Sequence, residues 1–379
     1  MLTRRCNMSC AHCSVESGPK VRGEPTDAEV IGMVNAVADA KLGSIQITGG
    51  EPMLREKLGF EVLRTARNRG LVCTLSTNVF WGRTQANAWR KVRALQRAGL
   101  ARITVSYDRY HAEFQGPDPA LNIVRAAEWF NLPININVTR VRDDPEMAGL
   151  MAPFEKSRHV KMRFYDVQVI GRARELPIAE FRGETSGFCN AACSPAVTED
   201  GRMTACNGPA YFQAIGSPLH VGSLKDSSIA DLIEKHRSDT ILETILCAGP
   251  ERLLYELEAA GVAREIGIRQ HHSGLCDLCI DINSNPAAVA ILRERLSDPR
   301  YQAELTARRM VIRTEQIDDE FQIDYVNGIG AARLWLDAAA GPDIGWDEEA
   351  GRLFGRADFD WRKSADYLAS CSLARAISP

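Results

Sequence analysis

The stretch RRCNMSCAHCS, residues 4–14, decides how this sequence is interpreted. It places Cys6, Cys10 and Cys13 within eight residues, in the spacing C-x3-C-x2-C, and the next cysteine, Cys73, falls inside a predicted strand. A structural zinc site takes four ligands, usually as two closely spaced pairs. Three thiolates suit an iron–sulfur cube better, because they leave one of its four irons open to another ligand.

The composition is ordinary for a globular protein, with 45% hydrophobic and 25% charged residues in a chain of 379. The net charge of −3 provides no basic surface for nucleic acid. No apolar run approaches the ~20 residues that span a bilayer, and no signal peptide follows Met1. We therefore expect a cytoplasmic protein without nucleic-acid or membrane partners. In that reducing compartment, eleven cysteines indicate metal binding or redox chemistry rather than disulfides.

Strand-like runs alternate with helical patterns up to about residue 175. Thr26 and Glu29 form a capping box for the first helix, and another helix runs from about Thr84 to a C-cap at Gly99. This alternation predicts parallel strands joined by right-handed crossovers. With a stub at residues 1–4 we count about six units, an α/β partial (β/α)6 barrel of the TIM type, whose chemistry lies on the loops after the strands. The predicted strands are residues 44–48, 71–76, 101–107, 133–140 and 161–170.

The regular alternation of strand-like and helical patterns ends after residue 175. Residues 189–206 predict a hairpin around an Asp200-Gly201 turn, and a C-x2-C pair, Cys276 and Cys279, follows downstream. The remaining chain has a mostly helical pattern. We therefore expect three parts, namely a barrel over 1–175, a second cysteine region over 176–285, and a helical extension of unknown role over 286–379.

The three-cysteine loop after the first strand of a βα barrel resembles the radical S-adenosylmethionine (radical SAM) superfamily. The segment ITGGEP, residues 47–52, follows the second strand and resembles the GGEP motif of that family. The resemblance implies that Cys6, Cys10 and Cys13 hold a 4Fe–4S cluster whose open iron is chelated by S-adenosylmethionine. Reductive cleavage then yields a 5′-deoxyadenosyl radical, which abstracts a hydrogen atom from the substrate.

The same resemblance, which covers residues 1 to about 175, implies a set of cofactor-binding residues. The segment LSTNVF resembles the family's TNG segment, with Val79 in place of the usual glycine. The segment VIGRARE resembles a Gly-Arg-Ala segment whose arginine pairs with the cofactor carboxylate or with substrate. The predicted cofactor-binding residues are Gly49, Gly50, Glu51, Ser76, Asn78 and Arg172.

The second set of cysteines resembles the auxiliary-cluster region of the SPASM and twitch branches of this superfamily. In that pattern a hairpin glycine, here Gly201, precedes the second cysteine by five positions, and a C-x2-C pair follows. No further cysteine follows before Cys371, which favours the shorter twitch form. Zinc remains an alternative, and Cys193 is an alternative to the first ligand. The implied ligands of an auxiliary 4Fe–4S cluster are Cys189, Cys206, Cys276 and Cys279.

The expected function is that of a radical SAM oxidoreductase with an auxiliary cluster that accepts electrons or binds substrate. The expected substrate is a ribosomally made peptide, modified by crosslinking, epimerisation or oxidation. A dehydrogenase or rearrangement enzyme for a small molecule such as an aminocyclitol or sugar is the alternative, and a non-catalytic zinc protein is a more remote one. The expected partners are a reductant such as flavodoxin or ferredoxin and a separate leader-peptide recognition protein, since little chain precedes Cys6.

Three further residues are candidates for catalysis. His111 follows the predicted strand at 101–107 and is a candidate acid–base group, with Asp108 beside it. Asp108 also fits a purely local role as a helix cap. Cys193 is a candidate hydrogen donor to a substrate radical. His12 directly precedes Cys13, and adjacent residues rarely bind one tetrahedral ion together.

Overall fold

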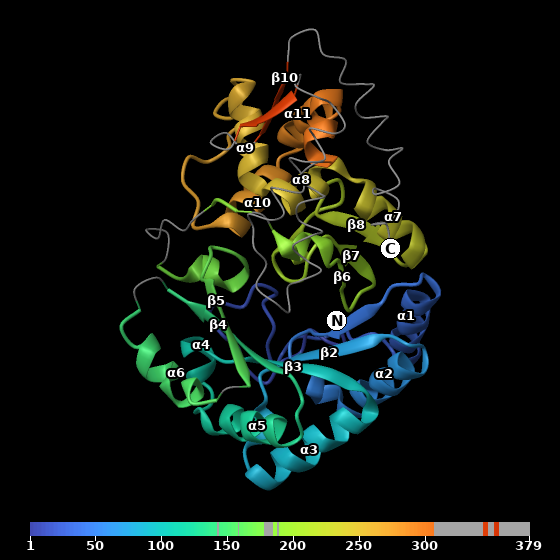
Figure 1. The fold of residues 1–379 in the computed structure, drawn as a ribbon, viewed down its shortest axis with the longest axis vertical. Coiled ribbons are helices and arrows are strands. Elements are labelled where there is room, and N and C mark those ends of the chain that lie inside the picture. The colour runs from blue at the N-terminus through green and yellow to red at the C-terminus, as the bar shows by residue number, and fades with distance from the viewer. Residues whose placement is uncertain are drawn as a thin grey trace.

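The computed structural model describes residues 1–141, 144–157, 159–177, 185–187, 189–306, 344–347 and 352–355. Its centre is a parallel sheet of five strands in the order β1-β2-β3-β4-β5 (Figure 1). The predicted α/β core is confirmed, and each predicted strand lies within a few residues of an observed one. The strands are β1 (Ser44–Ile47), β2 (Val72–Thr77), β3 (Leu100–Ser106), β4 (Ile134–Arg140) and β5 (Val160–Asp166).

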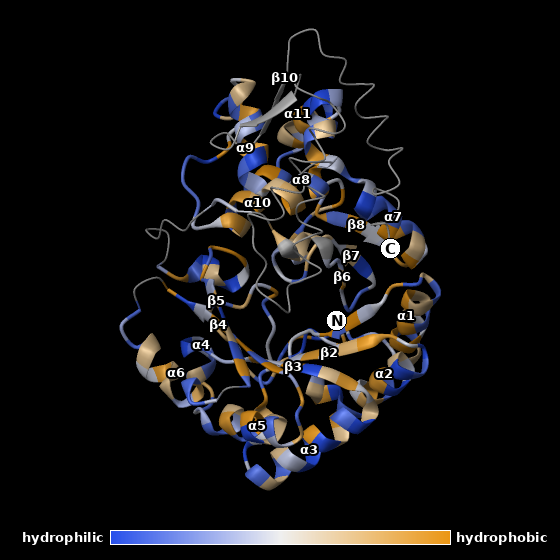
Figure 2. Cartoon of the chain, viewed as in Figure 1, coloured by the Kyte–Doolittle hydropathy of each residue, from blue (hydrophilic) through white to orange (hydrophobic). Residues whose placement is uncertain are grey.

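Helices connect these strands and cover the outer side of the sheet (Figure 1). The hydropathy colouring shows their apolar faces turned towards the sheet and their polar faces turned outward (Figure 2). The capping box of Thr26 and Glu29 is present, and Gly99 ends its helix with φ 110°, a conformation that favours glycine. The helices are α1 (Asp27–Asp39), α2 (Glu56–Asn68), α3 (Gln85–Ala98), α4 (Arg109–Ala112), α5 (Asp118–Trp129) and α6 (Met147–Glu155).

The stub predicted at residues 1–4 lies beside the end of β1. The Leu2 N–H donates to the Thr48 carbonyl at 2.9 Å, and the Thr3 carbonyl accepts the Gly50 N–H at 2.7 Å. These bonds place the start of the chain beside the end of β1. The segment is too short to form a strand of its own, so the sheet has five strands and a stub rather than six full units.

The second part of the chain contains the predicted hairpin. Its strands pair antiparallel around Gly201, which has φ 85°, and a third strand that the sequence did not predict completes a small sheet. Five helices follow and form their own hydrophobic core. These elements are β6 (Ala196–Val197), β7 (Arg202–Thr204), β8 (His220–Ser223), α7 (Ile229–Ser238), α8 (Thr240–Ala248), α9 (Pro250–Ala259), α10 (Leu275–Asn283) and α11 (Pro286–Arg295).

The extension from residue 286 is helical where it begins, in α11 and over residues 299–306. The sequence did not predict β9 (Ile344–Asp347) and β10 (Arg352–Gly355), which form an antiparallel pair. Their large aliphatic and aromatic residues favour strands. The rest of the predicted extension lies outside the described residues. No single helix in the described part is long and apolar enough to cross a membrane, although α10 and α11 together have the length and composition of a bent span.

A third, small apolar cluster surrounds the cysteine loop. The main core packs β1–β5 against their helices, and the second core packs the small sheet against α7–α11. In this third cluster, Met8 of the cysteine loop packs with Tyr110, Val167 and Ala173. The region just after β5 contacts the start of α10, because Gln168 accepts the Cys276 N–H at 2.6 Å.

Candidate functional site

A cavity of about 410 Å³ lies at the carboxyl ends of the parallel strands. Its wall combines the cysteine loop, the turn after β1, polar residues at the ends of β2 to β5, and the start of α10. Ligand sites in parallel α/β folds lie at this edge of the sheet. Among the predicted site residues, the wall includes Cys6, Cys10, Cys13, Gly49, Gly50, Ser76, Asn78, His111 and Cys276.

The cysteine loop turns its three thiols towards this cavity. Cys6 and Cys10 are buried, Cys13 is half-buried, and all three are free thiols. The Met8 N–H donates to Cys6 Sγ at 3.4 Å, and the Ser17 N–H donates to Cys13 Sγ at 3.3 Å. Burial raises the pKa of Cys6 to about 11, so this thiol needs a bound cation to become a thiolate at neutral pH. Three convergent sulfurs, two of which accept N–H donors, therefore fit an iron–sulfur cluster.

The two glycines of the GGEP turn allow the stub to lie against them. A Cβ atom on Gly49 would lie 2.1 Å from the Thr3 carbonyl oxygen, and one on Gly50 would lie 2.4 Å from that of Arg5. Any side chain at either position would displace the stub and, with it, the start of the cysteine loop. These glycines are therefore required by backbone packing and also line the cavity.

Glu51 is fully buried but does not line the cavity. Its carboxylate accepts hydrogen bonds from the Met53 N–H at 2.9 Å, the Thr77 hydroxyl at 2.9 Å and the Asn78 N–H at 2.7 Å. Burial raises its pKa to about 7. The side chain thus ties the turn after β1 to the end of β2, and its predicted contact with the cofactor stays a prediction.

The end of β2 carries two predicted residues in the cavity wall. The Ser76 hydroxyl accepts a hydrogen bond from Gln46 Nε2 at 2.9 Å, and Asn78 Nδ2 donates to Asn7 Oδ1 at 2.9 Å. Val79, which replaces the family glycine, has the left-handed conformation with φ 54°. Such a conformation is unfavourable for a β-branched residue and explains the glycine in the family pattern. Here the Thr77 hydroxyl holds it by accepting the Val79 N–H at 3.0 Å.

Arg172 lies behind the cysteine loop rather than in the cavity wall. Its Nη1 donates to the Cys10 carbonyl and its Nη2 to the Ser17 carbonyl, each at 2.7 Å. The preceding Gly171 has φ 52°, and a Cβ atom there would lie 2.5 Å from the Cys13 carbonyl oxygen. Both terminal nitrogens therefore hold the loop, and the pairing of Arg172 with the cofactor carboxylate or with substrate stays a prediction.

We expect Arg172→Ala to lower the free energy of unfolding by about 3 kcal/mol, since it removes two hydrogen bonds from a charged donor. Arg174→Ala is the matched control, because Arg174 is exposed and should change stability by less than about 0.5 kcal/mol. Denaturant unfolding of both variants measures the difference. Equal stabilities would show that the guanidinium does not hold the loop.

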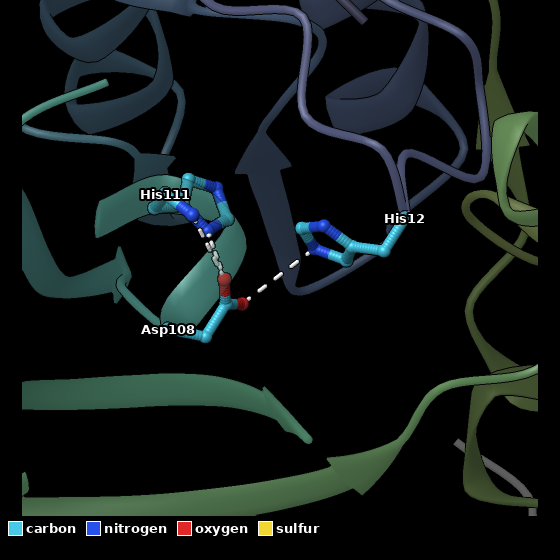
Figure 3. Close-up of side chains that lie close together, drawn as sticks. All are labelled: His12, Asp108 and His111. Carbon is cyan, nitrogen blue, oxygen red and sulfur yellow. Dashed lines mark hydrogen bonds and ion pairs between the residues drawn. The ribbon is translucent and has the colours of Figure 1, made fainter. Parts of the chain in front are cut away.

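Asp108 joins two histidines at the edge of the cavity (Figure 3). It caps α4 by accepting the Tyr110 N–H at 3.0 Å, as predicted, and also accepts His111 Nδ1–H at 2.8 Å. Although burial alone would raise the pKa of Asp108, the charge of His111 and its hydrogen bond lower it to about 2. The carboxylate therefore fixes the His111 tautomer and leaves Nε2 without a partner in the described chain.

His12 completes this group, which the sequence did not predict. Its Nε2 lies 3.5 Å from Asp108 Oδ2, and its ring stacks on Tyr110 with 4.6 Å between centroids. Burial lowers its pKa to about 4, against the opposing effect of Asp108. The imidazole and carboxylate donor atoms of His12, Asp108 and His111 lie within 4.8 Å of one another. Because Asp108 already accepts several N–H groups, a hydrogen-bonded network explains this arrangement better than a metal ion.

The structure brings the four predicted auxiliary thiols together. Burial raises the pKa of Cys279, and the nearby thiols of Cys206, Cys276 and Cys189 raise it further. Asn283 Nδ2 donates to Cys279 Sγ at 3.6 Å. Gln168, which the sequence did not single out, accepts the Cys276 N–H at 2.6 Å and holds the first turn of α10 against the strand ends. The side chain of Cys193 lies outside the described residues.

A family model described as the Radical SAM superfamily matches residues 1–131. The chain carries a radical SAM domain. This match includes the cysteine loop, the GGEP turn and the Asp108–His111 pair, and it makes the protein a radical SAM enzyme. Enzymes of this superfamily use a 4Fe–4S cluster and S-adenosylmethionine, and the three thiols of the cysteine loop fit that requirement.

The relatives of this radical SAM enzyme differ in how much of the chain they match. "Putative peptide biosynthesis protein YydG" from Bacillus subtilis is 24% identical over 73% of this chain and 89% of its own. A GTP 3′,8-cyclase from Listeria welshimeri is 28% identical over 45% of this chain, which spans about half of the cyclase. The crystal structure of BtrN in complex with AdoMet and 2-DOIA covers 64% of this chain and 84% of its own, with 16% identity and a TM-score of 0.37, too distant to guide the assignment.

Proposed function

We propose that this radical SAM enzyme modifies a ribosomally made peptide and that its second set of thiols holds an auxiliary 4Fe–4S cluster. One observation carries the proposal: Cys276 of the second set lines the same cavity as Cys10 of the first. A substrate in that cavity therefore lies between the two sets. The similarity to YydG supports a peptide, because it extends over 89% of a protein whose name refers to peptide biosynthesis.

When bound, the cluster and S-adenosylmethionine supply a 5′-deoxyadenosyl radical. The chain itself orients the substrate through the polar ends of its strands, where Asn137 and Thr139 line the cavity. His111 Nε2 is placed to accept or return a proton at the substrate, because Asp108 holds the other ring nitrogen. The thiol of Cys193 is proposed as a hydrogen donor. We further propose a cytoplasmic enzyme that receives electrons from a flavodoxin or ferredoxin.

The test is incubation of reduced enzyme with candidate substrates that carry deuterium on the reacting carbon. A peptide substrate should transfer deuterium into 5′-deoxyadenosine and be recovered with an altered mass. His111→Asn should lower peptide modification about a hundredfold while deoxyadenosine still forms. His271→Asn is the control, because His271 is exposed. Deuterium transfer from an aminocyclitol or sugar, with none from any peptide, would reject the peptide and leave a small-molecule enzyme.

A further inference from the structure

A second hollow, of about 1010 Å³, lies on the outer side of the domain between α2 and α3. It is formed near the carboxyl ends of these helices, together with the residue that ends α5. Because each helix runs antiparallel to its neighbouring strands, this place is at the opposite end of the sheet from the cavity (Figure 1). Three aromatic residues line it, namely Phe60, Trp89 and Phe130, and so do five arginines, namely Arg64, Arg67, Arg90, Arg93 and Arg97. We call this hollow the arginine groove.

The positive charge of the arginine groove is not neutralised by the described part of the chain. All five arginines are exposed, no carboxylate lines the groove, and none of the five makes an ion pair with a described residue. Arg67 donates to a backbone carbonyl and Arg90 to Asn87, whereas Arg64 and Arg93 make no hydrogen bond there. Like charges three and four residues apart destabilise a helix by a few tenths of a kcal/mol for each pair. A bound anion would offset that cost.

The aromatic residues make the groove unlike an ordinary solvated helix face. Trp89 packs against Trp129 at 5.1 Å and against Phe130 at 5.6 Å between ring centroids. Trp129 is 70% exposed at the edge of this aromatic group. Arginine and tryptophan together are the residues most enriched at the energetic centres of protein interfaces.

We propose that the arginine groove binds an acidic linear segment of the peptide substrate, outside the residues that react. This inference rests on the proposed peptide substrate. Guanidinium groups bind carboxylates in a bidentate manner, and the aromatic floor accommodates apolar side chains between them. A hollow between two helices suits a single extended segment. About ten extended residues span roughly 33 Å, enough to pass around a domain of this size.

Two other occupants are less well supported. A reductant must approach the thiols of the cysteine loop, and the groove lies at the other end of the sheet. Nucleic acid carries a negative charge on every nucleotide, and the net charge of −3 does not favour binding of such a long, dense polyanion. Carboxylates interspersed with apolar residues therefore match the groove better than a run of phosphates.

The test measures binding of a fluorescein-labelled peptide of about ten residues, in which glutamate alternates with phenylalanine and leucine, to the full-length holoenzyme. The double variant Arg64→Glu with Arg93→Glu should weaken binding about tenfold or more, and Arg93→Gln alone should weaken it less. Arg237→Glu is the matched control, because Arg237 is an exposed arginine in the last turn of a helix. A peptide with glutamine in place of glutamate should not bind.

Wild-type affinity in both groove variants would overturn the proposal. Displacement of the peptide by a single-stranded oligonucleotide at lower concentration than by unlabelled acidic peptide would overturn it in favour of nucleic acid. Formation of 5′-deoxyadenosine without substrate should be unchanged in the variants. Because binding is measured without turnover, a failure of this inference is distinguishable from a failure of the proposed peptide chemistry.

Discussion

Cys10→Ala should abolish formation of 5′-deoxyadenosine from S-adenosylmethionine under reducing, anaerobic conditions. Cys10 is buried in the cavity wall, and burial together with the neighbouring Cys6 raises its pKa, so it is poised for a metal rather than for free thiolate chemistry. Cys6 and Cys13 are already predicted ligands, and the loop has no further thiol that could replace Cys10. Iron content should fall by about half, from about eight atoms per chain to about four.

The matched control for this variant is Cys73→Ala. Cys73 is equally buried, but it lies in β2 within the main core and does not line the cavity. It should retain its iron and its deoxyadenosine formation. Normal cofactor cleavage in Cys10→Ala would reject the assignment of the three-cysteine loop, and loss of activity in both variants would show that the effect is not specific to the loop.

Cys276→Ala should also remove about half of the iron but leave cofactor cleavage in place. Cys276 lies in the first turn of α10, where Gln168 fixes its backbone, and burial, with the nearby thiols of Cys206 and Cys189, raises its pKa. Substrate modification should be lost, because the proposed auxiliary cluster faces the substrate cavity through this residue. Iron and sulfide analysis, with product analysis by mass spectrometry, separates the two effects.

Cys247→Ala provides the control for this second variant, because Cys247 is buried in α8 within the hydrophobic core of the second part of the chain. It should keep its full iron content. An unchanged iron content in Cys276→Ala would reject the proposed auxiliary cluster. Zinc bound at the second set in the wild-type enzyme would instead support the structural zinc alternative.

The core of the fold follows from short-range sequence patterns. Alternation of apolar runs with amphipathic helices predicts the five parallel strands, because crossover connections leave few other topologies. Thr26 and Gly99 mark helix ends because caps depend on neighbouring residues alone. Strand β8 and the β9–β10 pair could not be predicted in the same way. Each is short and is defined by a partner elsewhere in the chain.

The candidate site also combines features that neighbouring residues determine with features that distant partners determine. The spacing of Cys6, Cys10 and Cys13 identifies the loop because the ligands of one cluster are close in sequence. The role of Arg172 depends on which carbonyls the folded loop presents to it, and no local pattern contains that information. His12 seemed excluded as a neighbour of Cys13, but its stacking on Tyr110 directs it to Asp108 instead.

The most direct test of the central claim uses electron paramagnetic resonance on reduced Cys276→Ala, which isolates the cluster of the cysteine loop. Addition of S-adenosylmethionine labelled with nitrogen-15 in its amino group should change the spectrum and add a hyperfine coupling from that nitrogen. This result would show that the iron without a protein thiol binds the cofactor. A spectrum unchanged by S-adenosylmethionine, with no deoxyadenosine formed, would contradict the account.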